Sequence, residues 1–215
     1  IGTFLLRFDR RHTVLAGLPE GKFHMAILIL GLVIFLGVHS LRIIAEPTRD
    51  RLLARFGENR FKGIYSVLSL VGLMLIIYGY GAARMTTVPL YTPPPGLGHL
   101  ALLLVPVAFV LVASAYLPTG RIKTAVRHPM VLGVGLWALG HLLANGTVAD
   151  VVLFGSFLVW AVFDYASAIR RPVPASAGRA PRLRGDLLAV VVGLGLAAAF
   201  ILWLHRWFFG VAPIA

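Results

Sequence analysis

The sequence predicts an all-α, polytopic membrane protein with about six transmembrane helices. Hydrophobic residues make up 59% of the 215 residues and charged residues only 13%, against roughly 45–50% and about 25% in soluble domains. The apolar residues form long runs, and a helix needs ~20 of them to cross a bilayer. These runs do not alternate with polar residues, as the strands of a membrane β-barrel would.

Six segments have the required length and composition. In chain order they are residues 25–45, 62–82, 98–117, 128–147, 150–169 and 186–207. Each consists mainly of Leu, Val, Ile, Ala, Gly and Phe, and a helix satisfies the backbone hydrogen bonds of such a segment internally.

The predicted spans divide the chain into two parts. Residues 25–210 form a six-helix membrane domain, and residues 1–24 form an N-terminal extension. We interpret the extension either as sequence upstream of a functional start at Met25 or as a peripheral amphipathic segment.

The basic residues predict how the helices are oriented. The chain has 20 Lys and Arg against 8 Asp and Glu, a formal net charge of +12. Fourteen of the bases lie in the loops after the first, third and fifth spans, against two in the other connections and at the far end. Loops rich in Lys and Arg stay in the cytoplasm. The charge therefore indicates topology, and we expect the lipid bilayer, not nucleic acid, as the partner.

Histidines are the main candidates for chemistry, because the chain contains no cysteine and thiolate ligands are thereby excluded. His39, His128 and His141 lie within or at the ends of predicted spans, where a histidine is costly and indicates a function. Three imidazoles on two helices fit the ligation of haem iron in a helical bundle and fit zinc less well. The structural alternative for each is a hydrogen bond to a neighbouring helix.

Helical periodicity limits which histidines can pair. His128 and His141 are thirteen residues apart, which turns a straight helix by about 220° and points them to different faces. His39 must then supply one ligand, with His128 or His141 as the other. Trp137 shares a stripe of small residues beside His141, which would either accommodate a porphyrin or pack against a neighbouring helix.

Asp164 is the other unusual residue within the spans. It lies about one and a half turns inside the fifth span, at the level of Arg127 and His128. An intramembrane carboxylate is usually paired. We therefore expect an ion pair with Arg127 or an orienting hydrogen bond to a histidine ring, next to the cofactor.

Three motifs carry a resemblance to a known family. RHPMVLGVGLWALGHLLANG (127–146), HSLR (39–42) and DYASAIRR (164–171) together resemble the NnrU family of bacterial inner-membrane proteins, which are associated with denitrification and nitric oxide metabolism. The resemblance extends over residues 25–210. It implies an inner-membrane location and a distant relation to zeta-carotene isomerase, a membrane enzyme that contains haem b.

The resemblance also implies a set of site residues. The proposed haem ligands of the isomerase correspond to His39 and His141, and we expect haem b between them with His128 and Asp164 close by. Nitric oxide or a hydrophobic small molecule is the expected ligand. The isomerase has a cysteine at the position of Ala138, so a thiolate ligand switch is absent and isomerase-like chemistry would have to proceed without it.

Two other classes of protein remain as alternatives. A membrane methyltransferase or reductase similar to isoprenylcysteine methyltransferase would use the turn formed by Arg127, His128 and Pro129. The tyrosine of that turn and the downstream Glu pair typical of the class are missing here. A non-enzymatic accessory or assembly factor would use the histidines only structurally.

Overall fold

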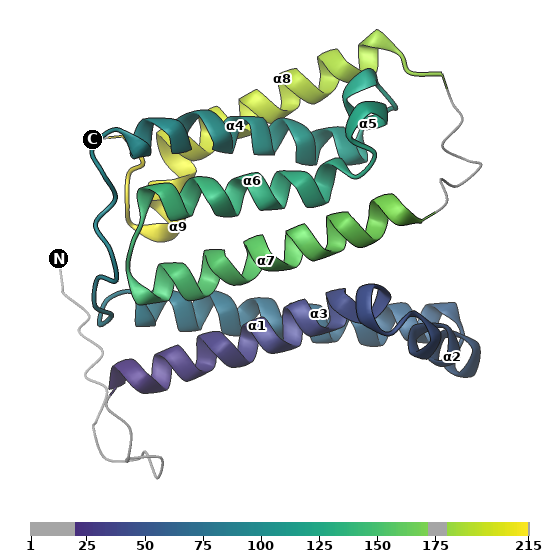
Figure 1. Cartoon of the computed structure of the whole chain (residues 1–215), viewed down its shortest axis with the longest axis horizontal. Helices are drawn as coiled ribbons and strands as arrows, with labels where there is room; N and C mark the ends of the chain where they lie inside the picture. Colours follow the sequence, from purple (N-terminus) through teal and green to yellow (C-terminus); the bar gives the residue numbers. More distant parts are fainter. Residues whose placement is uncertain (1–19, 172–179, 215) are drawn as a thin grey trace, which may run out of the picture.

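A computed structural model describes residues 20–171 and 180–214, which form a bundle of long helices (Figure 1). The elements are α1 (Glu20–Ile44), α2 (Glu46–Phe56), α3 (Glu58–Ala83), α4 (Leu97–Tyr116), α5 (Arg121–Val126), α6 (Pro129–Ala144), α7 (Val148–Arg170), α8 (Leu183–Ala199), the π-helical turn η2 (Phe200–Leu204) and α9 (His205–Phe209). Five helical segments are long and apolar enough to cross a membrane, namely α1, α3, α4, α7 and the continuous α8–α9 segment. The predicted all-α membrane fold is confirmed.

The long helices pack in the order α8, α4, α6 and α7, and α1 and α3 lie together on the far side of α7 (Figure 1). Within this row, α7 contacts α6 on one side and both α1 and α3 on the other. The bundle therefore has two groups of helices, one formed by α1–α3 and the other by α4, α6 and α8, and α7 lies between them.

The fourth span is shorter than the sequence predicted. Its helix, α6, has 16 residues and is about 24 Å long at 1.5 Å per residue. Pro129 occupies the first turn, where a missing N–H costs nothing, and the chain becomes extended at Asn145. The carbonyl of Gly146 then accepts the amides of Leu90 and Tyr91 from another loop, which explains why the helix stops at Ala144.

At the N-terminus, α1 begins at Glu20. Part of the segment assigned to the extension therefore continues the first span as helix. The remainder of that segment, residues 1–19, lies outside the described residues.

Close contact between α1 and α3 depends on glycine. A Cβ atom at Gly79 would lie 2.5 Å from the backbone nitrogen of Leu28, and one at Gly31 would lie 2.7 Å from that of Ile76. Small residues of this kind let helix backbones approach each other within a bilayer. Leu28 is 0% exposed at this contact, so the two helices form a tight pair.

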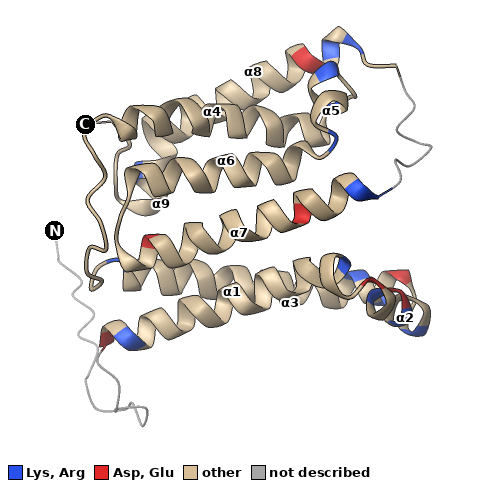
Figure 2. Cartoon of the chain, in the orientation of Figure 1, with Lys and Arg blue, Asp and Glu red and all other residues tan. Residues whose placement is uncertain are grey.

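Most Lys and Arg residues lie at one end of the bundle, around α2, α5, the end of α7 and the start of α8 (Figure 2). We call this the basic end. The charge separation predicted between the two sets of loops is thus present in the fold.

At the opposite end, the loop between α3 and α4 is fastened to the connection between α6 and α7. Val148 donates its amide to the carbonyl of Val88 at 3.1 Å. The hydroxyl of Tyr91 donates to the carbonyl of Leu142 and, at 2.7 Å, to that of Asn145. These carbonyls belong to the last turn of α6 and its cap, where helical partners are missing, so Tyr91 closes that end of the helix.

We expect Tyr91→Phe to lower the free energy of unfolding by about 1 kcal/mol, because the two carbonyls lose the single hydroxyl proton that they share. Burial raises the pKa of the Tyr91 phenol, and the charge of Asp150 raises it further. Since the raised pKa belongs to the folded state, the contribution is full below about pH 10 and is lost as the pH rises through the folded-state pKa. Thermal unfolding in detergent measures the effect, with Tyr78→Phe as the control, because among the described residues no hydrogen bond of the Tyr78 hydroxyl is present; equal melting of the two variants would contradict it.

Candidate functional site

A cavity of about 450 Å³ lies toward the basic end, between the two groups of helices. It combines two histidines, an acid, several bases and an apolar wall. Its lining residues are Val38, His39, Leu41, Arg42, Arg49, Phe61, Lys62, Tyr65, His128, Met130, Val131, Trp160, Asp164, Ala168 and Arg171. The volume is in the range of small-molecule sites, which are about 300–1,000 Å³.

His39 is held by its own helix and by aromatic neighbours. Its Nδ1 lies 2.7 Å from the carbonyl oxygen of Phe35, one turn earlier in α1. Because a carbonyl only accepts, Nδ1 carries a proton, and in the neutral ring Nε2 is then the nitrogen with the lone pair. The imidazole stacks on Phe35 at 4.3 Å and meets Trp160 edge-on at 6.2 Å. The ring is therefore oriented and has one nitrogen able to coordinate a metal.

His128 reaches the same cavity from the turn before α6. It is the N-cap of that helix, and its ring lies 6.4 Å from that of Tyr165, edge to face. The Tyr165 hydroxyl donates to the carbonyl of Val126 at 3.0 Å and holds the turn against α7. Arg127 has a φ of 59°, the only positive φ of a non-glycine among the described residues, and it does not line the cavity.

Asp164 pairs with Arg171 at 3.4 Å, so the predicted ion pair with Arg127 is wrong. The two side chains are only 18% and 22% exposed. Arg171 follows Asp164 by seven residues, which is two turns and therefore the same face of α7. The local partner at the C-cap of α7 thus replaces the expected one, which lies at the C-cap of α5.

Trp160 provides an unused donor in the wall of this cavity. Its indole Nε1 is buried and has no hydrogen-bond partner among the described residues. Buried polar atoms in native proteins are nearly always paired, and an indole N–H can only donate. This group is therefore suited to an acceptor atom of a ligand in the cavity.

His141 lies in the other half of α6 and does not line the cavity. Its Nδ1 lies 2.8 Å from the carbonyl oxygen of Trp137, and its ring stacks on Phe154 at 4.6 Å. Phe157 contacts Phe35 at 5.8 Å on one side and Trp137 at 5.6 Å on the other. Successive aromatic contacts therefore lead from His39 through Phe35, Phe157 and Trp137 to His141.

Of the predicted site residues, the cavity brings together His39, His128 and Asp164. Arg127, Trp137 and His141 lie outside its lining. Among the described residues, no group of three or more His, Asp and Glu side chains is arranged to hold a metal ion.

The stripe of small residues on α6 packs against α4. A Cβ at Gly133 would lie 2.9 Å from the carbonyl oxygen of Ala108, and one at Gly140 would lie 3.1 Å from a methyl group of Val105. Trp137 instead contacts Phe154 and Phe157 of α7. Of the two interpretations of the stripe, the contacts favour helix packing.

Sequence reasoning missed a second polar cluster, at the end of the bundle opposite the cavity. Asp150 is 5% exposed and accepts the hydroxyl of Tyr80 at 2.7 Å and the amide of Thr147 at 2.9 Å. It forms a capping box with Thr147 at the start of α7. The signal was present as an acid three residues after a threonine, just before an apolar run.

The fold and cavity define a class, a polytopic helical membrane protein with a histidine-containing cavity toward its basic end. The family model described as NnrU protein matches residues 27–213, and the chain belongs to the NnrU family. The resemblance noted in the three motifs is thereby confirmed. No curated protein and no solved structure matches the chain significantly.

Proposed function

We propose that this NnrU protein binds haem b in the cavity toward the basic end, with His39 and His128 as its iron ligands. The observation that carries the proposal is that two imidazoles from different helices line one cavity with an apolar wall. We favour His128 over His141 as the second ligand, because His128 lines the cavity with His39 and His141 does not.

The remaining lining residues suit the other parts of a haem. Val38, Met130 and Val131 offer apolar surface to a macrocycle, and Arg42 and Lys62 offer charge to its carboxylates. Arg42 and Lys62 now form exposed ion pairs with Glu46 and Glu58, and such pairs are weak enough to exchange. When bound, the haem would supply one-electron redox chemistry, with a position for nitric oxide where one imidazole is labile.

Other residues of the chain would then orient the ligand rings and set the charge around the cofactor. The carbonyl of Phe35 fixes the ring of His39, which also raises the basicity of a coordinating nitrogen. The Asp164–Arg171 pair places a compensated charge beside the two histidines. We further propose that the basic end faces the cytoplasm of a bacterial inner membrane and that the protein acts in nitric oxide metabolism, as the family resemblance implies.

The test is the absorption spectrum and haem content of protein purified from haem-replete cells. We expect a Soret band in the wild type that is lost or shifted in both His39→Ala and His128→Ala. His141→Ala and the exposed control His99→Ala should keep the wild-type spectrum, because neither side chain lines the cavity.

Each other outcome has a defined meaning. Loss of haem in His141→Ala but not in His128→Ala would move the site to the pair implied by the family resemblance. A wild type without a Soret band would overturn haem binding. Stabilisation by S-adenosylmethionine or NADPH, but not by haemin, would then indicate the methyltransferase or reductase class, and stabilisation by none of them an accessory factor.

A further inference from the structure

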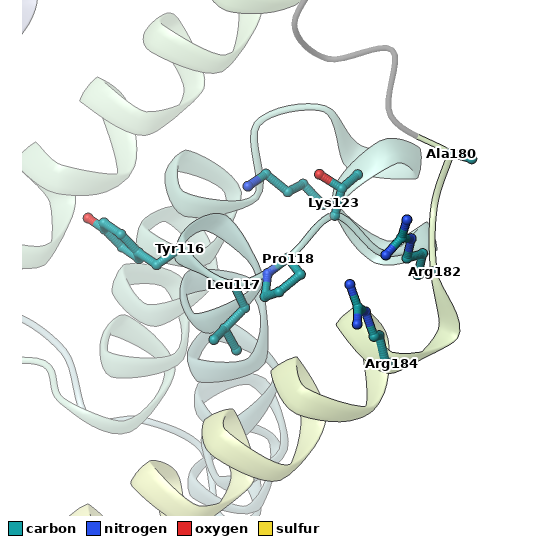
Figure 3. A pocket seen from close by; sticks show the side chains of 8 residues that line it. Tyr116, Leu117, Pro118, Lys123, Ala180, Arg182 and Arg184 are labelled. Carbon is teal, nitrogen blue, oxygen red and sulfur yellow. The ribbon is translucent and has the colours of Figure 1, made fainter.

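A second cavity lies at the basic end, on the far side of the bundle from the histidines. It has a volume of about 580 Å³ and is formed where α4 ends, α5 begins and α8 begins. Its bases are Lys123, Arg182 and Arg184, and its apolar part is Tyr116, Leu117 and Pro118. Figure 3 shows Arg182 and Arg184 beside one another, across the pocket from Pro118.

The backbone around this second cavity is tightly locked. Arg182 donates its amide to the carbonyl of Thr119 at 3.0 Å. The carboxylate of Asp186 accepts the amides of Arg121 and Ile122, both at 2.9 Å. A Cβ at Gly185 would lie 2.9 Å from the backbone nitrogen of Gly120, so only glycine at this position lets the start of α8 lie this close to the chain before α5. The backbone that carries the two arginines is therefore held in place by hydrogen bonds and close packing.

No ion pair among residues 20–171 and 180–214 compensates the charge of the second cavity. Within the described residues, none of its three bases forms an ion pair. Lys123 uses one of its three N–H donors on the carbonyl of Ala115 at 2.7 Å, and Asp186 is already committed to two amides. Guanidinium groups bind phosphate oxygens in bidentate geometry, so the second cavity is suited to a phosphate group.

The surroundings indicate that this phosphate belongs to a lipid. Tyr116 is 77% exposed at the end of α4, and tyrosines at the ends of spans mark the level of the headgroups. Leu183, Leu187 and Val191 are 67%, 58% and 68% exposed. Their spacing of four residues places them on one face of α8, which runs from the arginines into the apolar part of the helix.

We propose that the second cavity is a binding site for an anionic phospholipid. Its headgroup phosphate contacts Arg182, Arg184 and Lys123, and its acyl chains lie along the exposed apolar face of α8. Basic pockets at the ends of transmembrane helices bind such headgroups in this manner. The site is separate from the histidine-containing cavity, so the proposal does not depend on haem binding.

The test is native mass spectrometry of the delipidated full chain in neutral detergent, titrated with phosphatidylglycerol or phosphatidylcholine. We expect tighter binding of phosphatidylglycerol, weakened about tenfold in the double variant Arg182→Gln/Arg184→Gln, since charge-assisted hydrogen bonds to phosphate are lost. The control Arg51→Gln/Arg55→Gln removes the same charge from α2, at the same end, and should bind like the wild type. Inorganic phosphate and glycerol phosphate should not compete at concentrations where the lipid saturates.

Equal weakening in both double variants would show that only the overall charge attracts the lipid and would overturn the site. Competition by inorganic phosphate at the same concentration would identify a free-anion site and overturn the lipid. If the double variant does not fold, Arg184→Gln carries the same test, because this side chain is exposed. The variant Arg182→Lys/Arg184→Lys should show intermediate affinity, because lysine keeps the charge without the bidentate geometry.

Discussion

Gly79→Ala is expected to lower the free energy of unfolding by about 3 kcal/mol, at the upper end of the cost of overpacking a core. The added methyl group would lie 2.5 Å from the nitrogen and 2.7 Å from the Cα of Leu28. Both atoms belong to the backbone of α1, so no side-chain rotation relieves the contact and the two helices must separate. Thermal unfolding of the purified protein in detergent measures the loss.

Gly81→Ala is the matched control for this variant. Gly81 lies in the same helix, two residues further on, and a Cβ there would meet nothing within 4 Å. Alanine is favoured over glycine in a helix by about 1 kcal/mol, so this variant should melt at or slightly above the wild-type temperature. Similar losses in both variants would show that helix propensity, not contact between α1 and α3, governs the effect.

Asp150→Ala is expected to have a similarly large effect, about 2–4 kcal/mol. The variant removes the acceptor of the Tyr80 hydroxyl and that of the Thr147 amide, and each buried group left without a partner costs about 1–3 kcal/mol. It also removes half of the capping box of α7. Because Tyr80 is in α3, the expected consequence is a weaker attachment of α3 to α7, visible as a lower melting temperature.

Asp50→Ala provides the comparison for Asp150. Asp50 is likewise an aspartate with a hydrogen-bonded partner, Arg49 at 3.0 Å, but its side chain is 61% exposed. Exposed ion pairs contribute about 0–1 kcal/mol, so this variant should melt within about four degrees of the wild type. A loss as large as that of Asp150→Ala would contradict the role assigned to burial.

Gly79→Ala and Asp150→Ala both bear on the histidine-containing cavity, because the residues that line this cavity come from both groups of helices. His39 comes from α1, which packs on α3, whereas His128 comes from the turn before α6 and Asp164 from α7. Separating α1 from α3, or α3 from α7, would therefore displace one imidazole relative to the other. In the haem proposal, a stability defect at Gly79 or Asp150 would reduce haem content without any change to the ligands.

Much of the architecture could be predicted because it depends on segment composition. Runs of ~20 apolar residues predict spans wherever they occur, and the observed long helices fall on the predicted segments. The fourth span was predicted too long, because its end depends on the amides of Leu90 and Tyr91, which approach from a distant loop. Hydrogen bonds between side chains of different helices, such as that from Tyr80 to Asp150, depend on distant segments in the same way.

The site was predictable only in part, for a related reason. Histidine and aspartate within apolar runs are recognisable in the sequence, and three of the predicted residues do line one cavity. The wrong pairing of Asp164 with Arg127 came from comparing depth alone, since Arg171 lies on the same face of α7 and reaches the carboxylate first. Trp160 was missed because a tryptophan in an apolar run is indistinguishable in sequence from ordinary packing.

By itself, the sequence determined the membrane class, the approximate spans, the end at which the bases gather and the family. These are properties of single segments or motifs, and they need no knowledge of neighbours. Only the tertiary structure decided that His128 rather than His141 shares a cavity with His39, and that a second basic cavity lies at the start of α8. The physical reason is that a helix that is apolar on nearly all sides has no distinct polar face, so its sequence does not show which side packs against a neighbour. Close packing at glycines and a few buried hydrogen bonds decide which residues face each other.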